Sequence, residues 1–206
     1  TQRLGEVIVQ HLAAEGVAPA AALAAARTVA GAFGKLKPEG DAHPARIEQL
    51  AFVSPEERTA ALQMAERVAQ GEAGLDPASL LQRTDSAVDI AMFGRMLADA
   101  ADFGREAAVQ VAHAVTTHRA VAEDDFYTAV DDLKTPAEDA GAGFVGEQGF
   151  GSGVFYLYLC VDVDLLARNL GGNRALAAGA LAALAHAAAT VGPSGKQASF
   201  ASRARA

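Results

Sequence analysis

The hydrophobic pattern of this chain changes its period near Ser86, and that change limits the fold to one that combines helices with strands. Upstream, apolar residues recur at helical spacing, as in residues 2–15, a stretch closed by Gly16. Downstream, apolar and polar residues alternate in residues 88–93, 107–118 and 153–163, which predicts strands. This order predicts an α/β or α+β fold and excludes a helix bundle.

Local start signals place the helices more closely. Ser54 is a predicted N-cap, Pro55 suits the first helical position, and Glu57 completes a capping box, so a helix is predicted to run to about Gln70. Other helices are predicted over residues 19–33, after Asp76-Pro77, over residues 165–170, and from Asn173 to about Thr190; residues 47–53 (IEQLAFV) are predicted to form a strand.

The charge of the chain argues against a nucleic-acid partner, but its distribution is uneven. The formal net charge is −8 over 206 residues, whereas nucleic-acid binders usually carry a basic patch. The last twelve residues (GKQASFASRARA), in contrast, hold three cations and no acid. The single cysteine, Cys160, lies in an apolar run and is expected to be a buried thiol in a reducing compartment.

The sequence gives no sign of a membrane protein. Its longest apolar stretch, LAAGALAALAHAAATV, is based on alanine, and the N-terminus lacks a basic segment followed by an apolar one. We therefore expect a cytoplasmic protein with no membrane partner.

An aromatic pair, Phe126 and Tyr127, stands out in the acidic segment DDFYTAVDDL. Exposing rings to water is unfavourable, so rings among acids suggest a surface that a flat or apolar partner covers. Nucleic-acid bases and a neighbouring protein subunit both fit this description. The alternative is that these rings, and Met96, pack in the core of the protein itself.

The motifs that resemble catalytic sites do not meet their requirements. GPSGKQ lacks the glycine and the Ser or Thr of a phosphate-binding loop, since Thr190 and Gln197 occupy those positions. Around Ser152 the places of the two glycines in a nucleophile elbow hold Phe150 and Val154. We therefore expect no catalytic residue and no cofactor. Gly151, Ser152 and Gly153 still offer bare backbone that a ligand can approach closely.

An acidic cluster leaves one enzymatic alternative open. Asp124, Asp125, Asp131 and Asp132 could gather a divalent ion, although acidic pairs of this kind are more often a solvated rim. We expect no metal site.

Five segments, taken in order, resemble one known family. VDIAMFGRM, VAHAVTTH, DDFYTAVDDL, GSGVFYLY and NLGG…GKQASFA are similar to the backbone subunit, CasC, of the type I-E CRISPR surveillance complex Cascade. The resemblance extends from about Ala87 to the last residue. It is weaker over residues 46–70, and the first 45 residues contribute little.

The resemblance implies an α+β fold built on an RNA-recognition-like (ferredoxin-like) antiparallel palm sheet. A helical fingers insertion would occupy residues 1–86, and the palm residues 87–206, with a thumb hairpin at about 119–149. It further implies that copies stack into a filament along the CRISPR RNA, hold the guide without reading its sequence, and present it to target DNA beside other Cascade subunits. Cousins of this fold cut RNA, so a metal-dependent RNA endonuclease stays an alternative, as does a module whose aromatic pair binds only protein.

Family roles are carried over only to matching residues. Met96 corresponds to a wedge against the bases and follows Arg95 in the Gly-Arg-Met step, while Phe126 and Tyr127 correspond to the thumb aromatics. The backbone of Gly151, Ser152 and Gly153, together with Lys196 and Gln197, would contact RNA phosphates. Family members also carry a strand and a basic segment before the fingers and continue beyond Ala206, so we expect the chain to be a fragment that lacks both ends.

Overall fold

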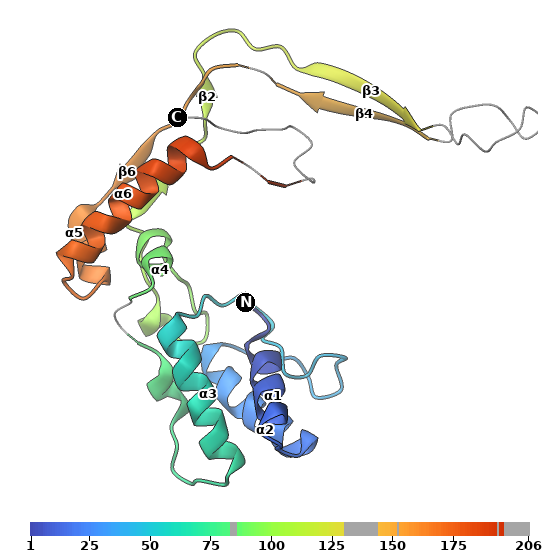
Figure 1. Ribbon diagram of the computed structural model, residues 1–206, viewed down its shortest axis with the longest axis vertical. Coiled ribbons are helices and arrows are strands. Elements are labelled where there is room, and N and C mark those ends of the chain that lie inside the picture. Colours follow the sequence, from blue (N-terminus) through green and yellow to red (C-terminus); the bar gives the residue numbers. More distant parts are fainter. Residues whose placement is uncertain (83–85, 130–143, 152, 193, 196–206) are drawn as a thin grey trace, which may run out of the picture. The chain divides into compact units, whose positions relative to one another are not determined.

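The computed structural model describes residues 1–82, 86–129, 144–151, 153–192, 194 and 195 (Figure 1). The chain divides into two compact units, the first formed by Thr1–Gln110 and Val161–Ala206 and the second by Val111–Cys160. Within the described residues, all the helices belong to the first unit, and the second contains short antiparallel strands.

Three helices form a bundle at the start of the first unit. They are α1 (Leu4–Ala14), α2 (Pro19–Ala30), continued by the short 3₁₀ helix η1 (Gly31–Phe33), and α3 (Pro55–Ala69), which pack together in Figure 1. α1 buries Leu4, Ile8 and Leu12, spaced four residues apart on one face, against α2 and α3. Burying each such side chain contributes about 1.5–3 kcal/mol, so the predicted helical stripe is confirmed and forms the core.

The N-terminus of α3 is fixed by the predicted capping box. The Ser54 hydroxyl accepts from the Glu57 backbone N–H at 3.1 Å, and the Glu57 carboxylate accepts from the Ser54 N–H at 3.0 Å. Both residues are buried, so these N–H groups have no water to satisfy them.

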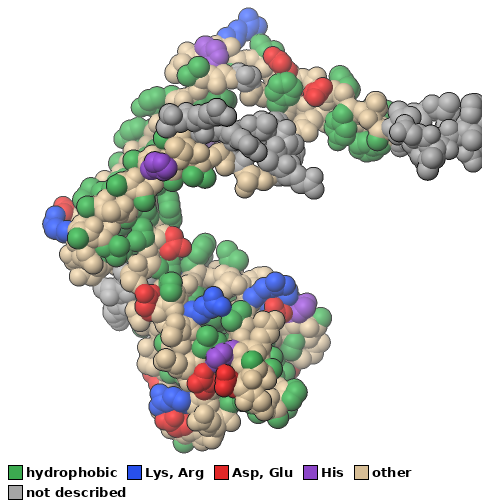
Figure 2. Space-filling view, in the orientation of Figure 1, with side chains coloured by type: hydrophobic (Ala, Val, Ile, Leu, Met, Phe, Trp, Pro, Cys, Tyr) green, Lys and Arg blue, Asp and Glu red, His purple; other side chains and the backbone are tan. Residues whose placement is uncertain are grey.

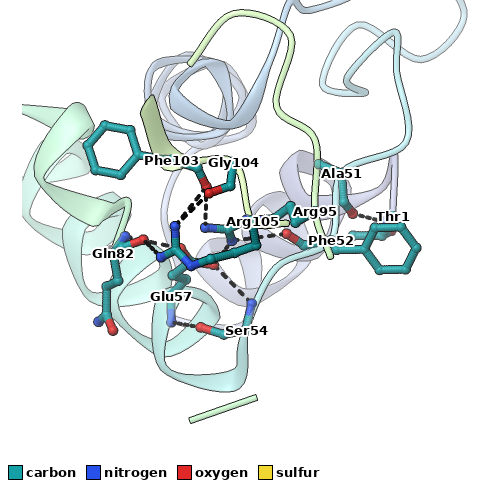
Figure 3. Close-up of polar contacts among 10 residues, drawn as sticks. All are labelled: Thr1, Ala51, Phe52, Ser54, Glu57, Gln82, Arg95, Phe103, Gly104 and Arg105. Carbon is teal, nitrogen blue, oxygen red and sulfur yellow. Dashed lines mark hydrogen bonds and ion pairs between the residues drawn. The ribbon is translucent and has the colours of Figure 1, made fainter. Parts of the chain in front are cut away.

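Glu57 also forms a buried ion pair with Arg95, which lies 38 positions further along the chain. Glu57 Oε2 is 2.7 Å from Arg95 Nη1, and both side chains are 0% exposed (Figure 3). The other carboxylate oxygen accepts from the Gln82 N–H at 3.2 Å, and the guanidinium donates to the carbonyls of Phe52 and Phe103. One carboxylate and one guanidinium thereby join α3 to Phe52 and Gln82, which lie outside helices and strands, and to Phe103 at the end of η3 (Ala101–Phe103).

A second hydrophobic cluster completes the first unit. It lies among α4 (Val88–Phe93), β1 (Val109–Val111), α5 (Val163–Asn169) and α6 (Arg174–Thr190), and it includes Met92, Leu166 and Leu170. Asp162 and Asn173 cap α5 and α6 by accepting from the backbone N–H groups of Leu165 and Leu176. The Asn169 side chain donates to the Ala91 and Glu106 carbonyls and so ties α5 to α4.

The strands form three two-stranded sheets. β1 pairs with β6 (Leu159–Val161), β2 (Val115–Thr116) with β5 (Phe155–Tyr156), and β3 (Glu123–Ala129) with β4 (Phe144–Phe150). The β3–β4 pair is an antiparallel hairpin whose register runs from Glu123 opposite Phe150 to Ala129 opposite Phe144. The short 3₁₀ helices η2 (Pro77–Leu80) and η3 (Ala101–Phe103) complete the regular elements.

Two predicted strands take other conformations. Residues 47–53 contain only an isolated bridge from Ile47 to Leu36, because their N–H groups bond to residues 1, 2 and 35 instead of to a neighbouring strand. Residues 88–93 form the helix α4, which buries the three consecutive residues Ile90, Ala91 and Met92. Six residues are too few to distinguish a helical period from a strand period when three consecutive side chains are buried.

The fold class is α+β, with helices segregated from small antiparallel sheets. The described residues do not show the four-stranded RNA-recognition-like palm sheet, since their strands pair only in twos. The fingers, palm and thumb boundaries at 1–86, 87–206 and 119–149 stay a prediction. Cys160 is exposed, contrary to the buried thiol that its apolar surroundings predicted.

No helix within the described ranges is both long and apolar enough to cross a bilayer.

The contribution of the Glu57 charge to its ion pair with Arg95 can be tested with Glu57→Gln, because glutamine can still complete the capping box. The substitution leaves the Arg95 charge buried without its counter-ion, so we expect the free energy of unfolding to fall by about 3–5 kcal/mol in urea denaturation. Glu72→Gln, which breaks the exposed Arg67–Glu72 pair, is the matched control and should change stability little. Equal effects of the two substitutions would contradict the assignment.

A second prediction concerns Glu6 on α1. Its carboxylate accepts from Arg46 Nε at 2.8 Å, and this hydrogen bond holds the pKa of Glu6 below its ordinary value of 4.5. A lowered folded pKa contributes stability that is present above the unfolded pKa and is lost as pH falls through the folded pKa. Wild type should therefore be more stable than Glu6→Gln at neutral pH. Urea titrations should show the difference shrinking below about pH 4, and a constant difference would refute the prediction.

Candidate nucleic-acid interface

The segment that follows α4 projects Met96 into solvent. Gly94 has φ +80°, and a Cβ there would lie 2.8 Å from the Arg105 carbonyl oxygen, so only glycine allows this close approach. Arg95 then pairs with Arg105 in an isolated antiparallel bridge. Because side chains alternate in extended backbone, Arg95 and Leu97 point inward while Met96 is 80% exposed.

Met96 lies on the rim of an apolar groove. The groove has a volume of about 390 Å³, and three other large hydrophobic side chains that line it, Leu50, Phe52 and Phe93, are also exposed. The remaining lining residues are Gly94, Arg95, Arg105 and Ala107. Exposed apolar side chains that gather around a hollow mark a binding surface, whereas isolated ones need no explanation.

The charge beside this groove comes from two arginines with different environments. Arg95 was expected to contact RNA, but its guanidinium is enclosed by Glu57 and by backbone carbonyls (Figure 3). Arg105 is half-buried, and its guanidinium donates to the carbonyls of Gln82, Phe103 and Gly104. The structure therefore gives Arg95 a structural position, and Arg105 lies at the groove wall.

The aromatic pair lies on the β3–β4 hairpin of the second unit, and its two rings do not form one surface. Successive side chains of a strand point to opposite faces, so Phe126 lies on one face and Tyr127 on the other. Phe126, 68% exposed, faces Glu147 across the hairpin, and Tyr127 faces Gly146. Both rings are exposed, so they do not pack in a core, as the alternative prediction had it.

Tyr127 packs on its own hairpin. A Cβ on Gly146 would lie 2.5 Å from Tyr127 Cζ, so the ring covers the bare backbone of this glycine. Its centroid is 5.8 Å from that of Phe144 at an interplanar angle of 45°. Cross-strand contacts of this kind contribute about 0.2–1 kcal/mol each and replace a core in an isolated hairpin.

The hairpin is acidic. β3 and β4 carry four carboxylates, from Glu123, Asp124, Asp125 and Glu147, and no Lys or Arg lies among the residues of these two strands. Figure 2 shows carboxylate and hydrophobic side chains next to one another there. A phosphate backbone is repelled by such a surface unless cations from elsewhere offset it.

The other predicted contact residues are only partly placed. Gly151 and Gly153 are exposed, and a Cβ on Gly153 would lie 2.5 Å from the His118 ring, which covers this glycine. Ser152, Lys196 and Gln197 lie outside the described residues. The same is true of Asp131 and Asp132 in the acidic cluster, while Asp124 and Asp125 point to opposite faces of β3. Among the residues with described positions, no three His, Cys, Asp or Glu side chains form a group that could hold a metal ion.

Sequence reasoning missed Leu50, Phe52 and Phe93. They were assigned to strands, in which their exposure is not evident. The signal that could have found them is the low aromatic content of the chain, nine Phe and three Tyr. With so few aromatic residues, each one near the Gly-Arg-Met step is a candidate for a binding surface.

The family model of CT1975-like proteins (Cas_CT1975) matches residues 1–206. This chain belongs to the CT1975-like family. No curated protein matches it in sequence.

The solved structures that are similar to this CT1975-like chain include chains of two surveillance complexes. A chain of a "CRISPR RNA-guided surveillance complex, pre-nicking" superposes with a TM-score of 0.84 at 31% identity, over 99% of this chain and 59% of that one. A chain of a "CRISPR RNA-guided surveillance complex" gives a TM-score of 0.50 at 32% identity, over 75% of this chain and 52% of that one. The CT1975-like chain thus spans little more than half the length of either.

The contact between Tyr127 and Gly146 can be tested by NMR. The ring current of Tyr127 should shift the Gly146 α protons upfield, and Tyr127→Leu should abolish that shift. Phe126→Leu, on the opposite face, is the control and should preserve it. An unshifted Gly146 signal in the wild-type protein would contradict the geometry.

Proposed function

We propose that this protein is the RNA-binding backbone subunit of a type I-E CRISPR surveillance complex. Copies of it assemble along a guide RNA, hold it without reading its sequence, and present it to target DNA beside the other subunits of the complex. The subunit itself is not catalytic. Membership of the CT1975-like family and the likeness to chains of two RNA-guided surveillance complexes support this assignment.

The observation that carries the proposal is the exposed apolar groove at Met96. Phe52 and Phe93 offer ring faces, and Met96 offers an unbranched, polarisable side chain that fits irregular gaps. Bases stack on aromatic side chains with about 1–3 kcal/mol each, and every base has a flat face. A groove of this chemistry therefore binds any guide sequence equally well.

Phosphate contacts complete the proposed interface. Arg105 places a positive charge beside the groove, close to where the backbone of a stacked nucleotide would run. Lys196, Gln197 and the glycine-flanked Ser152 are proposed to supply further contacts to phosphates. Phe126 and Tyr127 stay candidates for base contacts, but only one of them can face a given strand, because they lie on opposite faces of the hairpin.

The experiment uses the full-length protein, because this chain spans only part of its structural relatives. We expect Phe52→Ala to weaken binding to guide RNA about 5- to 150-fold, the equivalent of about 1–3 kcal/mol of lost stacking, for any guide sequence. Met96→Ala should act in the same direction. Fluorescence anisotropy with two unrelated guides measures both effects.

Val191→Ala, which shortens an exposed apolar side chain remote from the groove in sequence, is the matched control and should bind as wild type does. Unchanged affinity in both Phe52→Ala and Met96→Ala would refute the groove as the RNA site. A loss confined to one guide sequence would refute binding without sequence preference.

A further inference from the structure

The methionines of this chain differ sharply in their access to solvent. The sequence contains three of them, and the structure describes all three. Met64 and Met92 are 8% and 4% exposed, and each belongs to a hydrophobic cluster of the first unit, whereas Met96 is 80% exposed. A small oxidant in solution therefore reaches the Met96 thioether directly, but it reaches the other two only when the surrounding cluster opens.

The exposure of Met96 is a property of the folded backbone. Arg95 and Arg105 exchange two backbone hydrogen bonds, of 3.1 and 2.7 Å, which fix the extended conformation of this segment. The Arg95 guanidinium is buried and lies 2.7 Å from the Glu57 carboxylate (Figure 3). Because adjacent side chains in extended backbone point in opposite directions, a buried Arg95 directs Met96 outward. The native fold thus holds this thioether at the surface.

Two hollows adjoin the Met96 side chain. One is the apolar groove of about 390 Å³ that Leu50, Phe52 and Phe93 also line, which we call the Met96 groove. The other has a volume of about 520 Å³, and Leu97 is a further apolar residue in its lining. A change in the polarity of this one side chain therefore alters both hollows.

We propose that Met96 is a redox-sensitive modification site: peroxide converts its thioether into a sulfoxide and thereby weakens the binding of guide RNA. The sulfur lone pair attacks one oxygen of hydrogen peroxide, and an S–O bond forms as the O–O bond breaks. The departing hydroxide takes the proton of the transferred oxygen and leaves as water. Sulfur is oxidised and peroxide is reduced, so no further reactant is needed. The effect on RNA rests on the proposed function, whereas the selective oxidation does not.

The sulfoxide changes the most exposed of the four large hydrophobic side chains in the Met96 groove. A thioether is apolar and polarisable and packs against flat rings, whereas a sulfoxide is polar and accepts hydrogen bonds from water. A base that stacks in the groove removes water from this side chain. Covering a polar group without replacing its hydrogen bonds is unfavourable, so the oxidised groove binds nucleotides more weakly.

The first measurement is the oxidation rate of each methionine in the full-length protein, exposed to dilute hydrogen peroxide without RNA. Trypsin cleaves after arginine and so places the three methionines in separate peptides, which mass spectrometry quantifies. These peptides are residues 59–67, 84–95 and 96–105. Met96 should gain one oxygen roughly tenfold faster than Met64 or Met92, in line with its greater exposure.

The second measurement is the affinity for guide RNA before and after peroxide, by fluorescence anisotropy. Every protein compared carries Cys160→Ser, because the exposed Cys160 thiol also reacts with peroxide. Oxidation should weaken binding by about 5- to 150-fold. Met96→Leu has an apolar side chain without sulfur, so its affinity, whatever its starting value, should be the same before and after treatment. This variant controls for every other oxidation in the protein.

The two methionine sulfoxide reductases, one for each sulfoxide epimer, should together restore the affinity of the oxidised protein. The inference is overturned if Met64 or Met92 reacts as fast as Met96, or if RNA affinity survives complete oxidation of Met96. An equal loss in Met96→Leu, or a loss that the reductases do not reverse, assigns the effect to another residue and overturns it as well. Protein that binds no RNA before any peroxide is added refutes the proposed function, and the effect on RNA with it.

Discussion

The buried ion pair between Glu57 and Arg95 is the constraint on which the first unit depends. Desolvating two charges is expensive, and further hydrogen bonds to both groups help their attraction to offset this cost. Here Ser54 and Gln82 donate to the carboxylate, and Phe52 and Phe103 accept from the guanidinium, while the buried Arg95 Nε has no partner among the described residues. The arrangement fixes irregular segments that helix propensity could not hold. It also determines that Met96, the next residue along an extended strand, points outward.

The parts of the fold that follow from local chemistry could be predicted. The capping box at Ser54, the proline at the start of α2 and the Asn173 cap each involve residues within one helical turn, so the sequence alone identifies them. The α4 helix could not be identified in this way. Ala91 and Met92 are buried by contacts with the distant α5 and β1, and such contacts override a short periodic pattern. The strand predicted at residues 47–53 is wrong for a related reason, since the N–H groups of this segment bond to residues 1, 2 and 35.

The candidate site also has one part that could be predicted from the sequence and one part that could not. Exposure of Met96, Phe126 and Tyr127 agrees with the expectation that none of them fills the core. Leu50 and Phe52 could not be grouped with Phe93 and Met96 from the sequence, because more than 40 positions separate these two residues from Met96 and a buried arginine brings the two segments together. Reading Phe126 and Tyr127 as one surface ignored the alternation of side chains along a strand, which was available from the sequence once a hairpin was expected.

The β3–β4 hairpin differs from the rest of the protein in how its strands are stabilised. Almost every residue in it is exposed, and the Tyr127 ring over Gly146 takes the place of a hydrophobic interior. Two strands with no third layer are only marginally stable in water. Its amide protons are therefore expected to exchange with solvent through local opening of the hairpin. The hairpin can thus adjust its twist to a neighbour without any cost to the stability of the helical bundle.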